Sequence, residues 1–288
     1  MRISFSKSVT ESLLAKIRSG EMMSRNEKFN LIIQLSIPSI LAQVTTVLMF
    51  YIDAGMVGSL GAEPSAAIGL VEPATWLFFS LVSAVTMGFS VQVAHFIGAN
   101  DFAKARAVMR HGYIFGLCFA LFLLLITFLI GSRLPVWLGG GADIQHDATV
   151  YFLIFSLIIP FHLIEYMSAA MLKVSGDMRR PSSMAILMCV LDVIFNYFFI
   201  FPTRTVSLFG VEVTMPGLGE GVAGAALGSL LSFVCVALPL AYYAIFRSPI
   251  LAWKQDVERF VWRWQYIWNA MKIGAPMALQ YLLMNGAQ

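Results

Sequence analysis

Residues 31–61 read LIIQLSIPSILAQVTTVLMFYIDAGMVGSLG and form the first long apolar stretch of the chain. A helix needs about 20 mainly apolar residues to cross a bilayer, so this stretch is long enough. Two of its residues are unfavourable there. Pro38 cannot donate a backbone hydrogen bond and should bend the helix. An ionised Asp53 costs about 2.5 kcal/mol or more to insert, which indicates a partner or a function.

The polar residues of this stretch share one helical side. Ser39, Gln43, Thr46 and Asp53 follow one another at spacings of 4, 3 and 7 residues, which return to the same face of an α-helix. A polar stripe is unfavourable against lipid. We therefore expect it to face other helices or a water-filled cavity, with Gln43 and Thr46 among the lining residues.

The composition is that of an integral membrane protein. Hydrophobic residues make up 59% of the 288 and charged residues 12%, and the mean hydropathy is +0.78. Soluble domains carry about 25% charged residues. All three cysteines lie in apolar runs, so we expect neither a disulfide nor a cysteine metal site. We also expect no cofactor and no nucleic-acid partner.

Five further apolar stretches follow the first, which predicts an all-α lobe of six transmembrane helices. We expect a polar N-terminal segment over 1–28, the lobe over 29–246, an amphipathic linker over 247–268, and the start of a seventh helix over 269–288. Residues 203–220 read as a loop. The five later spans are expected at 66–97, 111–131, 148–171, 182–201 and 221–246.

Lysine and arginine residues outside the spans lie almost entirely on one side. If the spans alternate in direction, sixteen of these residues fall on the side of the N-terminus and two on the other. Cytoplasmic loops are enriched in Lys and Arg. The pattern therefore predicts a multi-pass protein of the inner (plasma) membrane, with a cytoplasmic N-terminus and cytoplasmic 1–28 and 247–268 segments.

Polar residues in the later spans are the other candidates for a site. Asp192 and Asn196 lie four residues apart, and His162 and Glu165 three apart, so each pair shares a helical face. Glu72 lies near the start of its span, so we interpret it as interfacial, with cavity lining as the alternative. His162 and Glu165 either reach the water interface or form a second protonatable site.

A short repeat marks the start of a second half. Residues 272–280 read KIGAPMALQ, and residues 34–43 read QLSIPSILAQ. Aligning Pro276 with Pro38 brings Gln280 to within one position of Gln43. The repeat comes just after six spans, where a second set of helices would begin in the same direction.

Several stretches together resemble a known family. They are IPSILAQ (37–43), YIDAGMVGSLGAEPSAAIGL (51–70), QVAHFIGANDFAKAR (92–106), KVSGDMRRP (173–181), VLDVIFNYFFIFP (190–202) and GLGEGVAGAALGS (217–229). In this order they resemble the N-terminal half of a multidrug and toxic compound extrusion (MATE) transporter. The resemblance implies twelve helices in two six-helix lobes, and export of amphipathic, often cationic, compounds in exchange for H⁺ or Na⁺ by alternating access.

The resemblance also implies site residues. Asp53 falls on the family's first-helix acid and Pro38 on its first-helix proline. On the fifth helix, members similar to the archaeal and DinF-like branch have Asn and then Asp four residues later, whereas here Asp192 precedes Asn196. We expect Asp53, Asp192 and Asn196 to bind the coupling ion, and the exchanged order leaves H⁺ and Na⁺ open. The alternative for Asp53 is a hydrogen bond between helices only.

Other functions fit less well. A lipid-linked oligosaccharide flippase of the same superfamily would favour basic residues inside the lobe, and the cores of the six spans contain none. A membrane-embedded hydrolase could use Asp53 and Asp192 as a carboxylate pair, but no nucleophile or metal motif accompanies them. A seven-helix receptor would have its N-terminus outside. The sequence therefore predicts a secondary active transporter, whose partners are a small amphipathic substrate, the bilayer and a C-terminal lobe.

Overall fold

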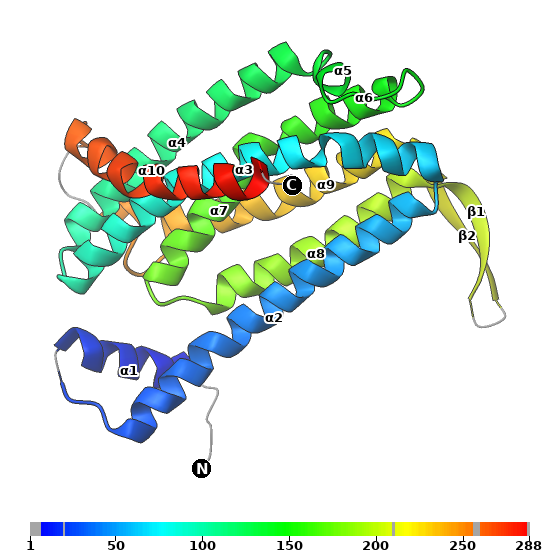
Figure 1. The fold of residues 1–288 in the computed structure, drawn as a ribbon. Helices are drawn as coiled ribbons and strands as arrows, with labels where there is room; N and C mark the ends of the chain where they lie inside the picture. The colour runs from blue at the N-terminus through cyan, green and yellow to red at the C-terminus, as the bar shows by residue number, and fades with distance from the viewer. Residues whose placement is uncertain (1–6, 20, 209–210, 256–259, 287–288) are drawn as a thin grey trace.

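The computed structural model describes residues 7–19, 21–208, 211–255 and 260–286. Within these residues, six helical segments are long and apolar enough to cross a membrane, which confirms the predicted helical lobe. They run in alternating directions along one bundle (Figure 1). The six are α2 (Arg25–Gly58), α3 (Ala62–Gly98), α4 (Phe102–Ile130), the pair α6 (Gln145–Ser156) and α7 (Ile158–Val174), α8 (Arg179–Ile200), and α9 (Gly221–Tyr242) with its π-helical extension Tyr243–Arg247.

The first spanning helix, α2, begins earlier than the apolar stretch does. Ser24 and Glu27 form a capping box: the Ser24 hydroxyl accepts from the Glu27 amide at 3.3 Å, and the Glu27 carboxylate accepts from the Ser24 amide at 2.8 Å. The helix therefore starts at Arg25, six residues before Leu31. It remains helical through Pro38, although proline cannot donate to the carbonyl four residues earlier.

The fourth span is interrupted. The α-helical hydrogen bonding of α6 ends at Ser156, and α7 begins at Ile158. Pro160 explains the break, because its ring clashes with the carbonyl of residue 156 and it supplies no N–H to that carbonyl. A short helix, α5 (Leu134–Trp137), precedes this span.

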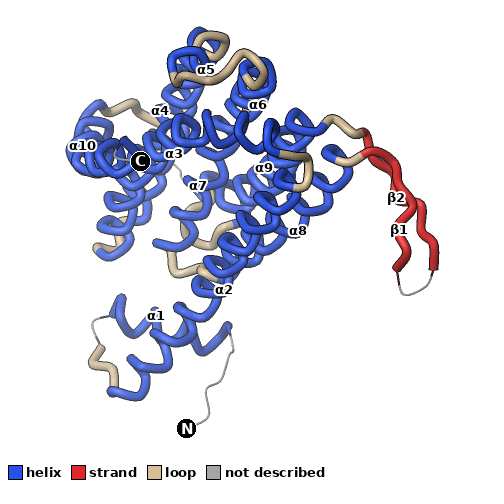
Figure 2. The backbone as a smooth tube through the Cα atoms, turned by 45° about the vertical axis from the view of Figure 1, so that its right-hand side comes forward, coloured by secondary structure: helices blue, strands red, loops and turns tan. Residues whose placement is uncertain are grey.

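Helix α3 is the central element of the bundle. It is the most extensively buried of the spanning helices, and α4, α7 and α10 (Trp264–Gly286) pack around it (Figures 1 and 2). Its contact with α10 is close. A Cβ on Gly88 would lie 2.2 Å from the Ala270 carbonyl oxygen, and one on Gly274 would lie 2.7 Å from that of Ala84. Glycine at both positions lets the two helix backbones approach.

The segment predicted as a loop, 203–220, is mostly a β-hairpin. Strands β1 (Pro202–Leu208) and β2 (Val211–Leu218) pair antiparallel, with Thr205 opposite Thr214. The hairpin projects from one end of the bundle (Figures 1 and 2). Each segment contains three β-branched residues, which suits a strand. Arg204 anchors the base, because its Nε donates to the Tyr197 hydroxyl at 2.9 Å.

The linker predicted to be amphipathic, 247–268, does not form one helix. Its described part holds a short 3₁₀ turn, Trp253–Gln255, and α10 already begins at Trp264 rather than at 269. Side chains of α4 fix it in place. Arg106 donates to the Ile250 carbonyl at 3.1 Å and Arg110 to the Trp253 carbonyl at 2.7 Å. These bonds take up carbonyls that would otherwise be used within a helix.

A short helix, α1 (Lys7–Ser19), occupies most of the predicted N-terminal segment. It lies beside the start of α2 (Figure 1). Leu13 is buried, and a Cβ on Gly176, in the turn between α7 and α8, would lie 2.6 Å from a Leu14 methyl. The apolar side of α1 thus packs on the protein at the end of the bundle.

Candidate functional site

One cavity brings nearly all the predicted site residues together. It has a volume of about 780 Å³ and lies between α2, α3, α6, α7, α8 and α9. Pro38 is the predicted residue that is not part of its lining, although the adjacent Ser39 is. The predicted residues that line the cavity are Gln43, Thr46, Asp53, Glu72, His162, Glu165, Asp192 and Asn196.

The centre of the site is an amide bridge between two carboxylates. The Asn196 Nδ2 donates to the Asp53 Oδ1 at 3.0 Å and to the Asp192 Oδ2 at 3.0 Å. Asp192 and Asn196 are 1% and 2% exposed, whereas Asp53 is half-buried at the cavity wall. A single primary amide carries two N–H groups, so it can serve both carboxylates at once. The bridge therefore joins α2 to α8 across 143 residues of sequence.

Two residues of α9 complete this arrangement, and the sequence reasoning missed both. The Ser232 hydroxyl lies 3.0 Å from the second Asp192 oxygen, in position to donate. A Cβ on Gly228 would lie 2.1 Å from the Asn196 Oδ1, so only glycine leaves room for that amide. Gly228 belongs to the small-residue run 221–229 of the sixth span, and Ser232 follows four residues later on the same helical face, which is the pattern that could have pointed to them.

The site offers oxygen ligands and two adjacent acids. The Asn196 Oδ1 is buried and has no hydrogen-bond partner among the described residues. Turning the amide over would exchange this oxygen with Nδ2 and direct it toward the carboxylates. Two carboxylates this close repel one another when both are ionised, and a proton or a cation between them removes that repulsion. The residues therefore fit either H⁺ or Na⁺.

A second polar group lies elsewhere along the cavity, on α7. His162 stacks on Phe79, with ring centroids 4.5 Å apart, and both of its ring nitrogens are buried without a partner among the described residues. Glu165 lies one turn further on, and the exposed Lys173 lies two turns beyond that. The structure thus places His162 and Glu165 on the cavity wall.

Aromatic residues line the same cavity and were not predicted as part of the site. Phe79 contacts Trp76, Phe155 and Phe233, with centroids 5.5–6.3 Å apart, in addition to His162. Glu72, interpreted from sequence as interfacial, accepts a hydrogen bond from the Trp76 indole at 3.2 Å within this wall. Stacked and edge-on rings are surfaces on which flat organic molecules bind.

Comparison with known proteins gives the family. The model of the MatE family matches residues 38–198. The chain is 25% identical over 264 residues to a probable multidrug resistance protein NorM of Neisseria meningitidis serogroup A, covering 91% of this chain and 54% of that protein. It is 21% identical over 262 residues to the multidrug export protein MepA of Staphylococcus saprophyticus, with the same two shares covered.

Solved structures agree on the fold. A multidrug resistance MATE family transporter of the MOP superfamily, in an outward-facing conformation, superposes with a TM-score of 0.79 at 23% identity, over 96% of this chain and 55% of that one. The chain thus spans about half the length of the curated relatives it matches. Because the family model covers more than half of its 288 residues, this multi-pass membrane chain belongs to the MatE family.

Proposed function

We propose that the full-length protein is a secondary active transporter, and not an enzyme, that exports amphipathic and often cationic organic compounds in exchange for H⁺ or Na⁺. The observation that carries this proposal is the Asn196 bridge between Asp53 and Asp192 in the wall of a large aromatic cavity. The names of the relatives, multidrug resistance protein and multidrug export protein, support the substrate class.

The two carboxylates are proposed to carry the coupling ion. When the ion leaves, the pair gains negative charge in a poorly hydrated site, and the helices that hold it are driven to rearrange. Asp53 belongs to α2, which contacts α8 extensively and its other neighbours only slightly. A change at the bridge therefore acts on the spanning helix that has the fewest contacts with the rest of the bundle.

The organic compound is proposed to bind along the aromatic wall, with Gln43, Thr46 and Glu72 on one side and His162 and Glu165 on the other. A second six-helix lobe, which the family's length implies, would close the cavity and make alternating access possible. Ion and compound then occupy one cavity but contact different residues.

A lipid-linked oligosaccharide flippase is the second candidate. Its substrate carries phosphate, for which proteins use Arg and Lys. Among the residues that line the cavity, Lys173 is the one Lys or Arg. The lining therefore favours an uncharged or cationic organic compound over a pyrophosphate.

Efflux assays test the proposed function. The full-length protein, produced in a host that lacks its own multidrug pumps, is expected to lower the accumulation of cationic dyes while an H⁺ or Na⁺ gradient is present. Collapsing the gradient should restore accumulation, and residues 1–288 alone should give none of this activity. Unchanged accumulation of every dye, together with rescue of a flippase-deficient strain, would show the second candidate to be correct.

Orientation is tested by cysteine labelling. We propose that the N-terminus is cytoplasmic, so in a cysteine-free background a cysteine at Ala62 should react with an impermeant thiol reagent added outside intact cells. Cysteines at Lys104 and Arg179 should react only after permeabilisation. Lys104 and Arg179 lie near the starts of α4 and α8, at the end of the bundle opposite to Ala62 at the start of α3 (Figure 1). The reverse pattern would overturn the orientation.

A further inference from the structure

A second surface cavity lies at the start of α2, away from the transport site. It has a volume of about 360 Å³ and is lined by Arg25, Asn26, Lys28, Phe29 and Ile32. The two cations and two apolar residues are spaced i, i+3, i+4 and i+7, so they share one helical face. All four are exposed, with Phe29 at 50% and Ile32 at 60%. We call these five residues the basic groove.

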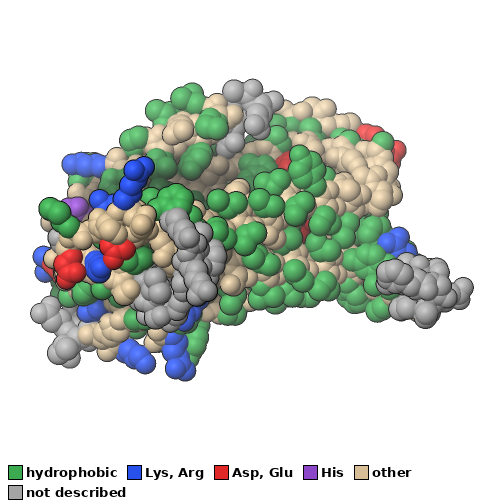
Figure 3. All heavy atoms as spheres, turned by 90° about the horizontal axis from the view of Figure 1, so that it is seen from below, with side chains coloured by type: hydrophobic (Ala, Val, Ile, Leu, Met, Phe, Trp, Pro, Cys, Tyr) green, Lys and Arg blue, Asp and Glu red, His purple; other side chains and the backbone are tan. Residues whose placement is uncertain are grey.

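Charge and hydrophobicity are separated along the groove. Arg25 and Lys28 lie at the end of α2, where Lys and Arg gather on the molecular surface (Figure 3). Ile32 lies about 10 Å from Arg25 and about 6 Å from Lys28 along the helix axis, within the apolar part of α2. A ligand that matches this order has an anionic group at the end of the bundle and a hydrocarbon chain directed into it.

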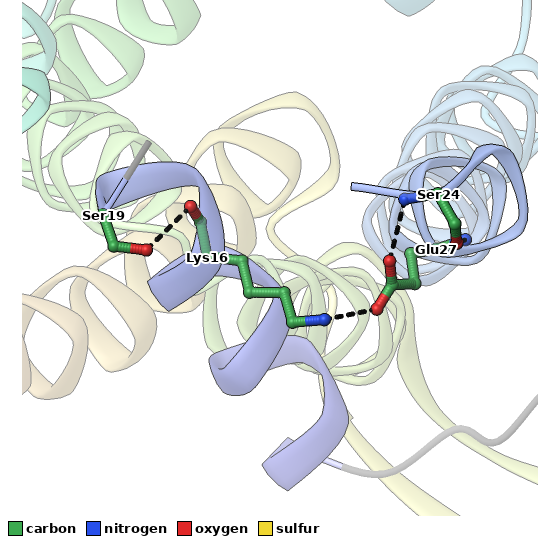
Figure 4. Close-up of polar contacts among 4 residues, drawn as sticks. All are labelled: Lys16, Ser19, Ser24 and Glu27. Carbon is green, nitrogen blue, oxygen red and sulfur yellow. Dashed lines mark hydrogen bonds and ion pairs between the residues drawn. The ribbon is translucent and has the colours of Figure 1, made fainter. Parts of the chain in front are cut away.

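The acidic residue beside the groove is neutralised by α1. Glu27 is the acidic residue in the first turn of α2, and its Oε1 lies 2.5 Å from the Lys16 Nζ. Its Oε2 accepts from the Ser24 amide (Figure 4). The hydrogen bond to Glu27 raises the pKa of Lys16, as expected for a cation paired with a carboxylate. Helix α1 thus offsets the charge of Glu27 and leaves those of Arg25 and Lys28 available.

We propose that the basic groove binds the head group of one anionic membrane phospholipid, with an acyl chain lying along Phe29 and Ile32. Juxtamembrane clusters of Lys and Arg attract anionic lipids, and here the cations directly border exposed apolar side chains. Free phosphate would use only the cationic half of the groove. A phospholipid uses both halves and would hold the α1–α2 corner at the membrane interface. This proposal does not depend on the transported compound.

Native mass spectrometry of the full chain in a neutral detergent tests the proposal. Titration with dioleoylphosphatidylglycerol is expected to show one preferred bound lipid, and dioleoylphosphatidylcholine none. The double variant Arg25→Gln, Lys28→Gln should weaken phosphatidylglycerol binding about thirtyfold, which is about 2 kcal/mol for two charges at an anionic surface. The charge-preserving pair Arg25→Lys, Lys28→Arg should retain binding.

Two controls separate a groove from general surface charge. Lys254 is exposed in the linker, outside the groove, so Lys254→Gln should leave phosphatidylglycerol affinity unchanged. Phe29→Ser with Ile32→Ser should weaken it, because the acyl chain loses its surface. A phosphatidylglycerol affinity of the Arg25→Gln, Lys28→Gln variant equal to that of the wild type would overturn the proposal. The proposal would also be wrong if Lys254→Gln lost as much phosphatidylglycerol affinity as the double variant, or if millimolar inorganic phosphate displaced the lipid.

Discussion

Asp53→Asn is expected to reduce gradient-driven efflux by the full-length protein to the level of cells without the transporter. Asparagine has the shape of aspartate but neither ionises nor exchanges a proton, so the site can no longer change charge by one unit at this position. The side-chain oxygen of the introduced asparagine can still accept from the Asn196 amide, which in the wild type spans 3.0 Å to the Asp53 Oδ1. The variant should therefore fold and reach the membrane.

The matched control for this substitution is Asp101→Asn. Asp101 lies outside the cavity and caps α4 by accepting from the Lys104 amide at 3.1 Å, a role that asparagine also fills. Its efflux should equal that of the wild type. Both variants are compared at equal membrane abundance with a fluorescent cationic dye. If a well-expressed Asp53→Asn variant exports the dye at the wild-type rate, Asp53 does not carry the coupling ion and only joins α2 to α8.

Gly228→Ala is expected to have the second large effect, on both stability and efflux. The added Cβ would lie 2.1 Å from the Asn196 Oδ1, 2.8 Å from its backbone nitrogen and 3.0 Å from its Cα. Two of these atoms are backbone, so rotation of the Asn196 side chain cannot relieve the overlap. Helices α8 and α9 must separate locally, at a cost of about 1–3 kcal/mol for overpacking. Separation also moves Asn196 from its position between the carboxylates.

Gly69→Ala is the matched control for Gly228→Ala. Gly69 also lines the cavity and also lies within a spanning helix, but a Cβ there would meet nothing within 4 Å. Thermal unfolding in detergent should show a lower midpoint for Gly228→Ala and little change for Gly69→Ala. Dye efflux should follow the same order. A midpoint and an efflux rate equal to wild type in Gly228→Ala would show that α8 and α9 adjust freely at this level.

The presence and order of the spans follow from the amino-acid sequence alone, although α2 and α4 begin six and nine residues before their expected apolar stretches. The length of an apolar run reports directly on whether a helix can cross a bilayer, since that depends on local composition and little else. Asp53, Asp192 and Asn196 could be singled out because polar groups are rare and costly inside such runs. Their spacing placed them on inward faces, and the structure brings them within hydrogen-bond distance of one another.

Which helices meet could be learned only from the folded chain. Spanning helices are apolar on most sides, so their periodicity does not show which face packs on which neighbour. The contact of Gly228 with Asn196, the donation by Ser232 and the approach of α10 to α3 at Gly88 all join segments far apart in the chain. The β-hairpin depends on the pairing of β1 with β2, and the linker depends on hydrogen bonds from Arg106 and Arg110. The local sequence pattern does not predict these partners. Backbone groups outside the helices pair with whichever donors and acceptors the fold brings near, and the sequence alone leaves those partners open.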